Sequence, residues 1–175
     1  MKPLRTIGLM GILVGSAVAS LSAAVVFNPC DSMTGFSVAP SFNPPDYGVQ
    51  ADGGLEGSSP LTVDNGIFFT PRADNDHALS WNISAVVTPA DTLTVDVRNV
   101  LILGAATLSV NVYYDGLAKP YVGLKDFKLD DDLFHSIKVT MPGGGTHRIN
   151  RIEFVVAENT KVVLIDNLTL TVVPQ

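Results

Sequence analysis

Residues 149–173 read I-N-R-I-E-F-V-V-A-E-N-T-K-V-V-L-I-D-N-L-T-L-T-V-V, and this stretch decides the fold. Two runs rich in β-branched residues flank a polar turn at residues 158–160, which predicts a closing pair of strands. Side chains alternate between the two faces of a strand, so one face of the second run carries an apolar row that contains Asp166. The members of this row are Leu164, Asp166, Leu168, Leu170 and Val172.

An aspartate in an apolar row needs a physical explanation, because an isolated buried carboxylate is very costly. Three arrangements would make an ionised Asp166 acceptable. It can accept hydrogen bonds from strong donors, it can be turned outward by a β-bulge, or it can bind a cation.

The beginning of the chain predicts export. Lys2 and Arg5 precede an apolar run at residues 7–21 that ends in small residues, the pattern of a secretory signal peptide. The run is short for a membrane span, so we expect cleavage after Ala23 or Ala24 and no membrane attachment afterwards. Residues 1–24 are thus assigned to the signal peptide and residues 25–175 to one domain, which is secreted to the extracellular space or the cell envelope.

Charge and cysteine content narrow the possible partners. The chain has a formal net charge of −6, which argues against binding to nucleic acid or to an anionic membrane surface. Its single cysteine, Cys30, cannot form an internal disulfide. Cys30 is either a buried apolar residue, which we favour, or a link between molecules.

The rest of the sequence predicts many short strands separated by turn residues, without a convincing amphipathic helix after the leader. Residues 39–60 are rich in Pro, Gly, Ser and Asp and predict a long surface loop or an irregular edge. Strands at this spacing indicate an all-β protein with an antiparallel sandwich or barrel. The expected strands are residues 25–27, a strand near Phe36, 61–70, 79–87, 92–103, 107–114, 121–129, 134–141 and the closing pair.

Two of these strands alternate strictly. Leu93, Val95 and Val97 point to one side of their strand, and Asp96 and Arg98 point to the other. The next strand repeats the pattern with Asn111 and Tyr113 on its polar side. If the two strands pair, Asp96, Arg98, Asn111 and Tyr113 form one polar outer surface, which is either a solvated sheet face or a ligand-binding groove.

Three motifs occur in an order that resembles the galactose-binding-like β-jelly-roll domains, which include many calcium-containing carbohydrate-binding modules. They are C-D-S-M-T-G-F at residues 30–36, E-G-S-S-P-L at residues 56–61, and I-N-R-I-E-F with I-D-N-L-T-L within residues 149–170. The resemblance spans nearly all of the chain after the leader. It implies an antiparallel β-sandwich with jelly-roll topology.

The resemblance also implies a structural calcium ion where the first turn meets the last strand. Asp31 and Asp166 would supply carboxylates, and backbone carbonyls near Gly57 and Asp166 would complete the oxygen shell that calcium prefers. The alternative is that Asp31 caps a turn and Asp166 accepts backbone N–H bonds.

The sequence gives little support to catalysis. It has no G-x-S-x-G or H-E-x-x-H motif, and its three histidines lack metal-ligand spacing. The parity of Trp81 places it in the core, and that of His135 places it at the core edge. We therefore expect a secreted, non-catalytic module that binds a polysaccharide or other glycan. The alternative is a structural or adhesive protein of an extracellular assembly, for which self-association is possible.

Overall fold

The computed structural model describes residues 24–38, 47–50, 66–69, 78–100, 104–157 and 162–172. The predicted signal peptide up to residue 23 and the expected calcium ligand Gly57 lie outside these ranges. In the described ranges no helix is long and apolar enough to cross a membrane.

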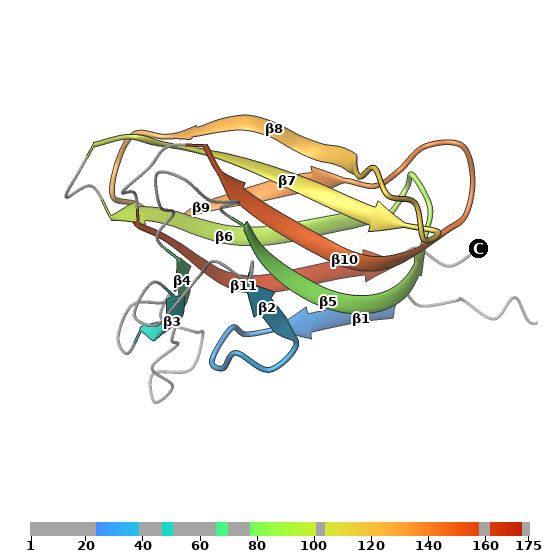
Figure 1. The fold of residues 1–175 in the computed structure, drawn as a ribbon, viewed down its shortest axis with the longest axis horizontal. Helices are drawn as coiled ribbons and strands as arrows, with labels where there is room; N and C mark the ends of the chain where they lie inside the picture. Colours follow the sequence, from blue (N-terminus) through green and yellow to red (C-terminus); the bar gives the residue numbers. More distant parts are fainter. Residues whose placement is uncertain are drawn as a thin grey trace, which may run out of the picture.

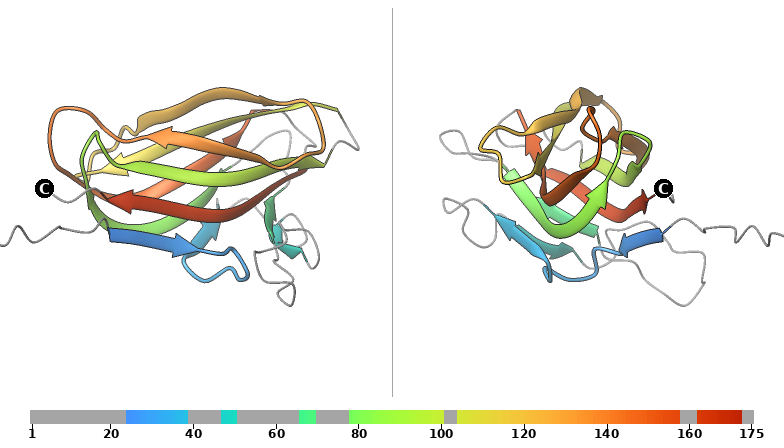
Figure 2. Two further views of the ribbon diagram at one scale, coloured as in Figure 1. Left: turned by 180° about the vertical axis from the view of Figure 1, so that it is seen from behind. Right: turned by 90° about the vertical axis from the view of Figure 1, so that its right-hand side faces the viewer.

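The described residues form two antiparallel sheets that pack face to face, as Figures 1 and 2 show. Sheet A has the strand order β3-β4-β11-β6-β9, and β1 also pairs with β11. Sheet B has the order β2-β5-β10-β7-β8. The strands of sheet A are β1 (Ala24–Asn28), β3 (Tyr47–Gln50), β4 (Gly66–Phe69), β6 (Thr92–Val100), β9 (His135–Thr140) and β11 (Val162–Val172). Those of sheet B are β2 (Phe36–Val38), β5 (Ala78–Val87), β7 (Ala106–Tyr114), β8 (Tyr121–Leu129) and β10 (His147–Val156).

The core lies between the sheets and follows the alternation in the sequence. Leu93, Val95 and Val97 of β6 are fully buried, and their polar neighbours point away. Cys30 and Trp81 belong to the same core, as predicted. The antiparallel all-β sandwich is therefore confirmed, and the first strand, β1, pairs with the last, β11.

Within the stretch predicted as a long surface loop or an irregular edge, residues 47–50 form β3 at the edge of sheet A. Two expectations about the strands are wrong. The two closing strands do not pair, because β10 belongs to sheet B and β11 to sheet A. The strands that carry the polar row, β6 and β7, also belong to different sheets. Asp96 and Arg98 thus lie on the outer face of sheet A, whereas Asn111 and Tyr113 lie on that of sheet B, and these four residues cannot line one groove.

Both closing strands contain a β-bulge. The register of β11 shifts between Asp166 and Thr169, where Asn167 has a φ of 48°. Ile165 and Leu168 are three residues apart, yet both point into the core, so Asp166 faces outward. The single apolar row predicted for this strand is therefore wrong, since Leu164 and Asp166 lie on the opposite side from Leu168.

The second bulge lies in β10, whose register shifts between Ile149 and Arg151 against both of its neighbours. Here Ile149 and Ile152 are three residues apart, and both are fully buried in the core. The residues between them, Asn150 and Arg151, therefore both become available to the outer face of sheet B.

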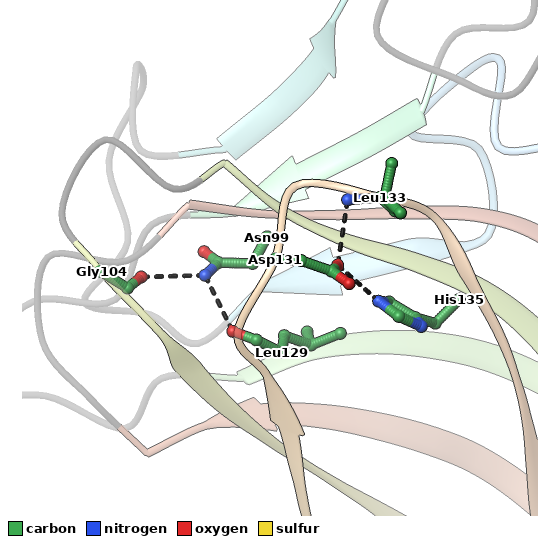
Figure 3. A network of polar contacts seen from close by, with 6 residues as sticks. All are labelled: Asn99, Gly104, Leu129, Asp131, Leu133 and His135. Atoms are coloured by element: carbon green, nitrogen blue, oxygen red, sulfur yellow. Dashed lines mark hydrogen bonds and ion pairs between the residues drawn. The ribbon is translucent and has the colours of Figure 1, made fainter.

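One end of the sandwich is closed by the polar contacts in Figure 3. The buried Asn99 side chain donates to the carbonyls of Gly104, at 2.9 Å, and Leu129, at 3.0 Å, which ties β6 to the end of β8 in the other sheet. Beside it, Asp131 Oδ1 lies 2.6 Å from His135 Nε2 and accepts the N–H of Leu133. These contacts hold the connection between the two sheets, and the prediction of a core-edge His135 is confirmed.

Candidate functional sites on the two outer faces

On the outer face of sheet A, the β11 bulge brings Asp166 to the turn that follows β1. Asp166 is 0% exposed, and its Oδ1 accepts the N–H of Asn167 at 2.8 Å. Burial raises the pKa of the Cys30 thiol to about 12, and the charges of Asp166 and Asp31 add to the rise. The charges of Asp31, the next residue in the chain, and of Asp166 thus both act on the Cys30 thiol. The calcium site expected from Asp31, Gly57 and Asp166 stays a prediction.

A local turn holds Cys30 in this place. Its N–H donates to Asn28 Oδ1 at 2.9 Å, an Asx turn, and its φ of 64° lies in the left-handed region. The Cys30 thiol donates to the Asn28 carbonyl oxygen at 3.8 Å. These local contacts hold the turn after β1 in its conformation.

The same face carries a second carboxylate and an arginine on β6. Asp96 is the cross-strand partner of Asp166, and Arg98 is that of Leu164. The Arg98 guanidinium lies over the Phe134 ring, with Cζ 5.9 Å from the ring centroid. Two of the residues predicted to bind a ligand, Asp96 and Arg98, therefore belong to the neighbourhood of the predicted metal site.

The described residues on this face fit a hard cation in part. Asp166 and Asp31 each carry carboxylate oxygens whose charge acts on Cys30, and Asp96 lies opposite Asp166 on the adjacent strand. The described ranges contain no group of three or more His, Cys, Asp or Glu side chains arranged to hold a metal ion. A calcium ion at this place would consequently need backbone carbonyls for much of its shell, as calcium accepts.

The outer face of sheet B holds a connected polar network around Glu153. Glu153 Oε2 accepts hydrogen bonds from Asn111 Nδ2 and from the Tyr113 hydroxyl, each at 3.1 Å. The Arg151 guanidinium lies over the Tyr113 ring, with Cζ 3.7 Å from the centroid. Burial, followed by the charge of Glu153, raises the pKa of Tyr113. The network fixes Tyr113 and Arg151 as one planar stack on β7 and β10.

Beside this stack the surface opens into a hollow of about 400 Å³. One wall comes from β10 and from Asn82 of β5, and the other from the turn between β7 and β8. The Asn82 amide is itself held by Ser37 of β2, whose hydroxyl accepts from Asn82 Nδ2 at 3.1 Å. The residues that line the hollow are Asn82, Tyr113, Gly116, Leu117, Ala118, Asn150 and Arg151.

The turn that forms the second wall is fixed at its base. Asp115 and Gly116 both have positive φ, and Leu117 N–H donates to the Tyr114 carbonyl, the geometry of a tight hairpin turn. Asp115 Oδ2 lies 2.6 Å from His147 Nδ1. This contact raises the pKa of His147, and the His147 contact lowers the pKa of Asp115.

Sequence reasoning found half of this site. Asn111 and Tyr113 were identified from their alternation, but Arg151 and Glu153 were missed, because they look like ordinary outward residues of an alternating strand. The spacing of three between Ile149 and Ile152 was the available signal. This spacing indicates a bulge, and the bulge places Arg151 opposite Tyr113.

A comparison of the sequence with protein-family models and with curated proteins gives no match. Comparison of the fold with solved structures does. The chain is similar to the CBM22-1 xylan-binding domain of Paenibacillus barcinonensis Xyn10C, with a TM-score of 0.62 and 14% identity over 90% of this chain and 99% of that one.

Two further solved structures are similar to the chain at lower scores. A variant of the CBM29-2 carbohydrate-binding module in complex with mannohexaose has a TM-score of 0.52 and 14% identity, over 86% of this chain and 93% of that one. A CBM28 module specific for non-crystalline cellulose has a TM-score of 0.51 and 11% identity, over 77% of this chain and 86% of that one. The chain therefore has the jelly-roll β-sandwich fold of carbohydrate-binding modules, and the predicted resemblance is confirmed at the level of the fold.

Proposed function

We propose that this chain is an exported, non-catalytic carbohydrate-binding module whose site is the hollow beside Tyr113 and Arg151. The observation that carries the proposal is the network in which Glu153 fixes Tyr113 while Arg151 stacks on its ring. A site of this kind binds at lower entropic cost, because its side chains are ordered before the ligand arrives.

The chemistry of the hollow suits a sugar. Planar groups such as the Tyr113 ring and the Arg151 guanidinium present flat surfaces to a pyranose ring. The amides of Asn82 and Asn150 offer both donors and acceptors to hydroxyl groups. None of the described residues that line the hollow is a carboxylate, whereas glycoside hydrolysis ordinarily uses a pair of them. The fold of the similar modules supports the same conclusion.

The experiment is a titration of the mature protein with a panel of soluble polysaccharides, using a matched pair of variants. Arg151→Ala and Arg98→Ala each remove an arginine stacked on an aromatic ring, but on opposite faces of the sandwich. We expect Arg151→Ala to weaken glycan binding about tenfold or more, because it removes one half of the planar stack, and Arg98→Ala to leave it unchanged. Equal losses in the two variants, or no binding to any glycan by the wild type, would contradict the proposal.

The proposal has two further parts: the module binds a structural calcium ion, and the protein is exported. Calcium at Asp31 and Asp166 is supported by the burial of Asp166 and by the action of both charges on Cys30 in the first turn. Such an ion would link the turn after β1 to β11 through its oxygen ligands. The test is thermal unfolding with and without a chelator. Export would be checked by mass spectrometry of the secreted protein, which should begin near Val25.

A second candidate function, as a structural protein of an extracellular assembly, is favoured by one observation. Val25 and Phe27 of β1 are more than half exposed, and among the described strands β1 pairs only with β11. Such a strand can pair with the same strand of a second copy. Sedimentation of the mature protein distinguishes the two functions, because a concentration-dependent dimer lost in Phe27→Lys would favour assembly.

A further inference from the structure

The hollow differs in charge from the rest of the molecule. Its described lining contains one charged residue, Arg151, although the whole chain has a formal net charge of −6. The other lining residues are neutral. A ligand in this hollow therefore meets a cation without a facing carboxylate in the lining.

Arg151 forms a long ion pair with Glu153 and no hydrogen bond to it. Its Nη2 lies 3.9 Å from Glu153 Oε1, which is too long for a hydrogen bond. The other carboxylate oxygen of Glu153 already accepts from Asn111 and Tyr113. Arg151 Nε is buried without a hydrogen-bond partner, while the side chain as a whole is 38% exposed. Stacking on Tyr113 thus positions the guanidinium, and its outer N–H groups remain directed to a ligand.

Neighbouring charges add to this local excess. Lys119 follows the lining residue Ala118 in the turn, and Arg148 lies on the outer side of β10, with Nη1 3.5 Å from Ser84 Oγ. Among the described acidic side chains of this face, Glu153 lies beside Arg151, Asp115 contacts His147, and Asp126 contacts Ser109. Arg151 in the lining, with Lys119 and Arg148 on the adjoining turn and strand, favours an anionic ligand.

We propose that the glycan taken by this hollow carries carboxylate groups, so that the ligand is a uronic acid polymer. This inference rests on the proposed function and specifies the ligand class of the same site. Arg151 binds the sugar carboxylate through its outer N–H groups, because the planar guanidinium matches a carboxylate in two parallel hydrogen bonds. Asn82 and Asn150 bind the hydroxyls of the same residue or its neighbour.

The experiment compares acidic hexasaccharides with their neutral counterparts. Hexamers prepared from polygalacturonate, alginate and glucuronoxylan are titrated into the mature protein, and each is paired with its carboxyl-reduced form, which keeps the linkage and removes the charge. We expect at least one acidic hexamer to bind about ten to a hundred times more tightly than its reduced form, as hydrogen bonds to charged groups do. We also expect this preference to shrink when sodium chloride is raised from 50 mM to 500 mM.

Arg151→Gln should abolish the preference, because the amide keeps hydrogen-bonding groups but lacks the charge. Arg98→Gln on the opposite face is the matched control and should keep the preference. Equal binding of every acidic and reduced pair would overturn this inference and leave the proposed function standing. Failure of all acidic, reduced and neutral glycans to bind would overturn both, and a preference that survives Arg151→Gln would assign the carboxylate to another place.

Discussion

The two closing strands, β10 and β11, each contain a β-bulge, but the two bulges have different consequences. In β11 the bulge lies between Ile165 and Leu168, and it presents Asp166 to the outer face of sheet A, where it is buried beside the turn at Cys30. In β10 the bulge lies between Ile149 and Ile152, and it presents Arg151 to the outer face of sheet B, beside an open hollow. Each bulge places a charged residue outside the core without breaking the apolar layer beneath it.

The difference between the two places is what surrounds the displaced residue. The Asp166 carboxylate is fully buried, and its charge acts on Cys30 in the turn that follows β1, the strand paired with β11. The Arg151 side chain lines the hollow and is 38% exposed. We therefore expect changes on sheet A to affect stability more than binding, and changes on sheet B to do the reverse.

The largest effect is expected at Asp166. Asp166→Ala should lower the free energy of unfolding by about 2–3 kcal/mol, because it leaves buried donors without their acceptor. Urea denaturation of the wild type and the variant measures this loss. Asp96→Ala, on the opposite strand but only half-buried, is the control and should cost under about 1 kcal/mol.

The proposed calcium ion should increase the contribution of Asp166 to stability. Calcium at 100 times its dissociation constant would raise the free energy of unfolding by about 2.7 kcal/mol. Asp166→Asn keeps the shape of the side chain and removes its charge, so it should reduce this response. If a chelator leaves the wild-type unfolding curve unchanged, Asp31 and Asp166 act only through turn and backbone hydrogen bonds.

A smaller effect on stability is expected for the network on sheet B. Tyr113→Phe removes the hydroxyl that donates to Glu153 but keeps the ring under Arg151. It should lower the free energy of unfolding by about 1 kcal/mol and weaken glycan binding several-fold, because Tyr113 and Glu153 become less fixed. Tyr121→Phe removes a comparable contact, with Thr140 at 3.0 Å, away from the hollow. It should leave binding unchanged, and equal binding losses in the two variants would assign the effect to the fold.

Alternation made most of this fold predictable, and bulges and sheet crossings made the rest unpredictable. The inward residues of β6 and β7 could be predicted because each strand alternates without interruption. Their assignment to opposite sheets could not, since it depends on contacts far apart in sequence, such as β6 with β11 and β7 with β10. The sequence left open whether a bulge turns Asp166 outward, which the left-handed Asn167 does, and the partners that the bulge in β10 brings to Tyr113 were not predicted.

The smallest expected effect concerns the hairpin turn beside the hollow and its dependence on pH. His147 Nδ1 and Asp115 Oδ2 are 2.6 Å apart, and His147 Nε2 lies 2.9 Å from the Gly143 carbonyl oxygen. Both ring nitrogens face acceptors, so the imidazolium form satisfies both contacts. These contacts raise the pKa of His147 above 6.5 and lower the pKa of Asp115 below 3.8.

The sign of the effect follows from these two shifts. The stabilisation by the raised pKa of His147 is complete below pH 6.5 and is lost as the pH rises through that raised value. The stabilisation by the lowered pKa of Asp115 is complete above pH 3.8 and is lost as the pH falls through that lowered value. A double-mutant cycle of His147→Gln and Asp115→Asn should therefore give a small favourable coupling energy at pH 5.5 that disappears at pH 8.5. A coupling energy equal at the two pH values would mean that the contact acts through a neutral histidine, and the turn beside the hollow would then be insensitive to pH in this range.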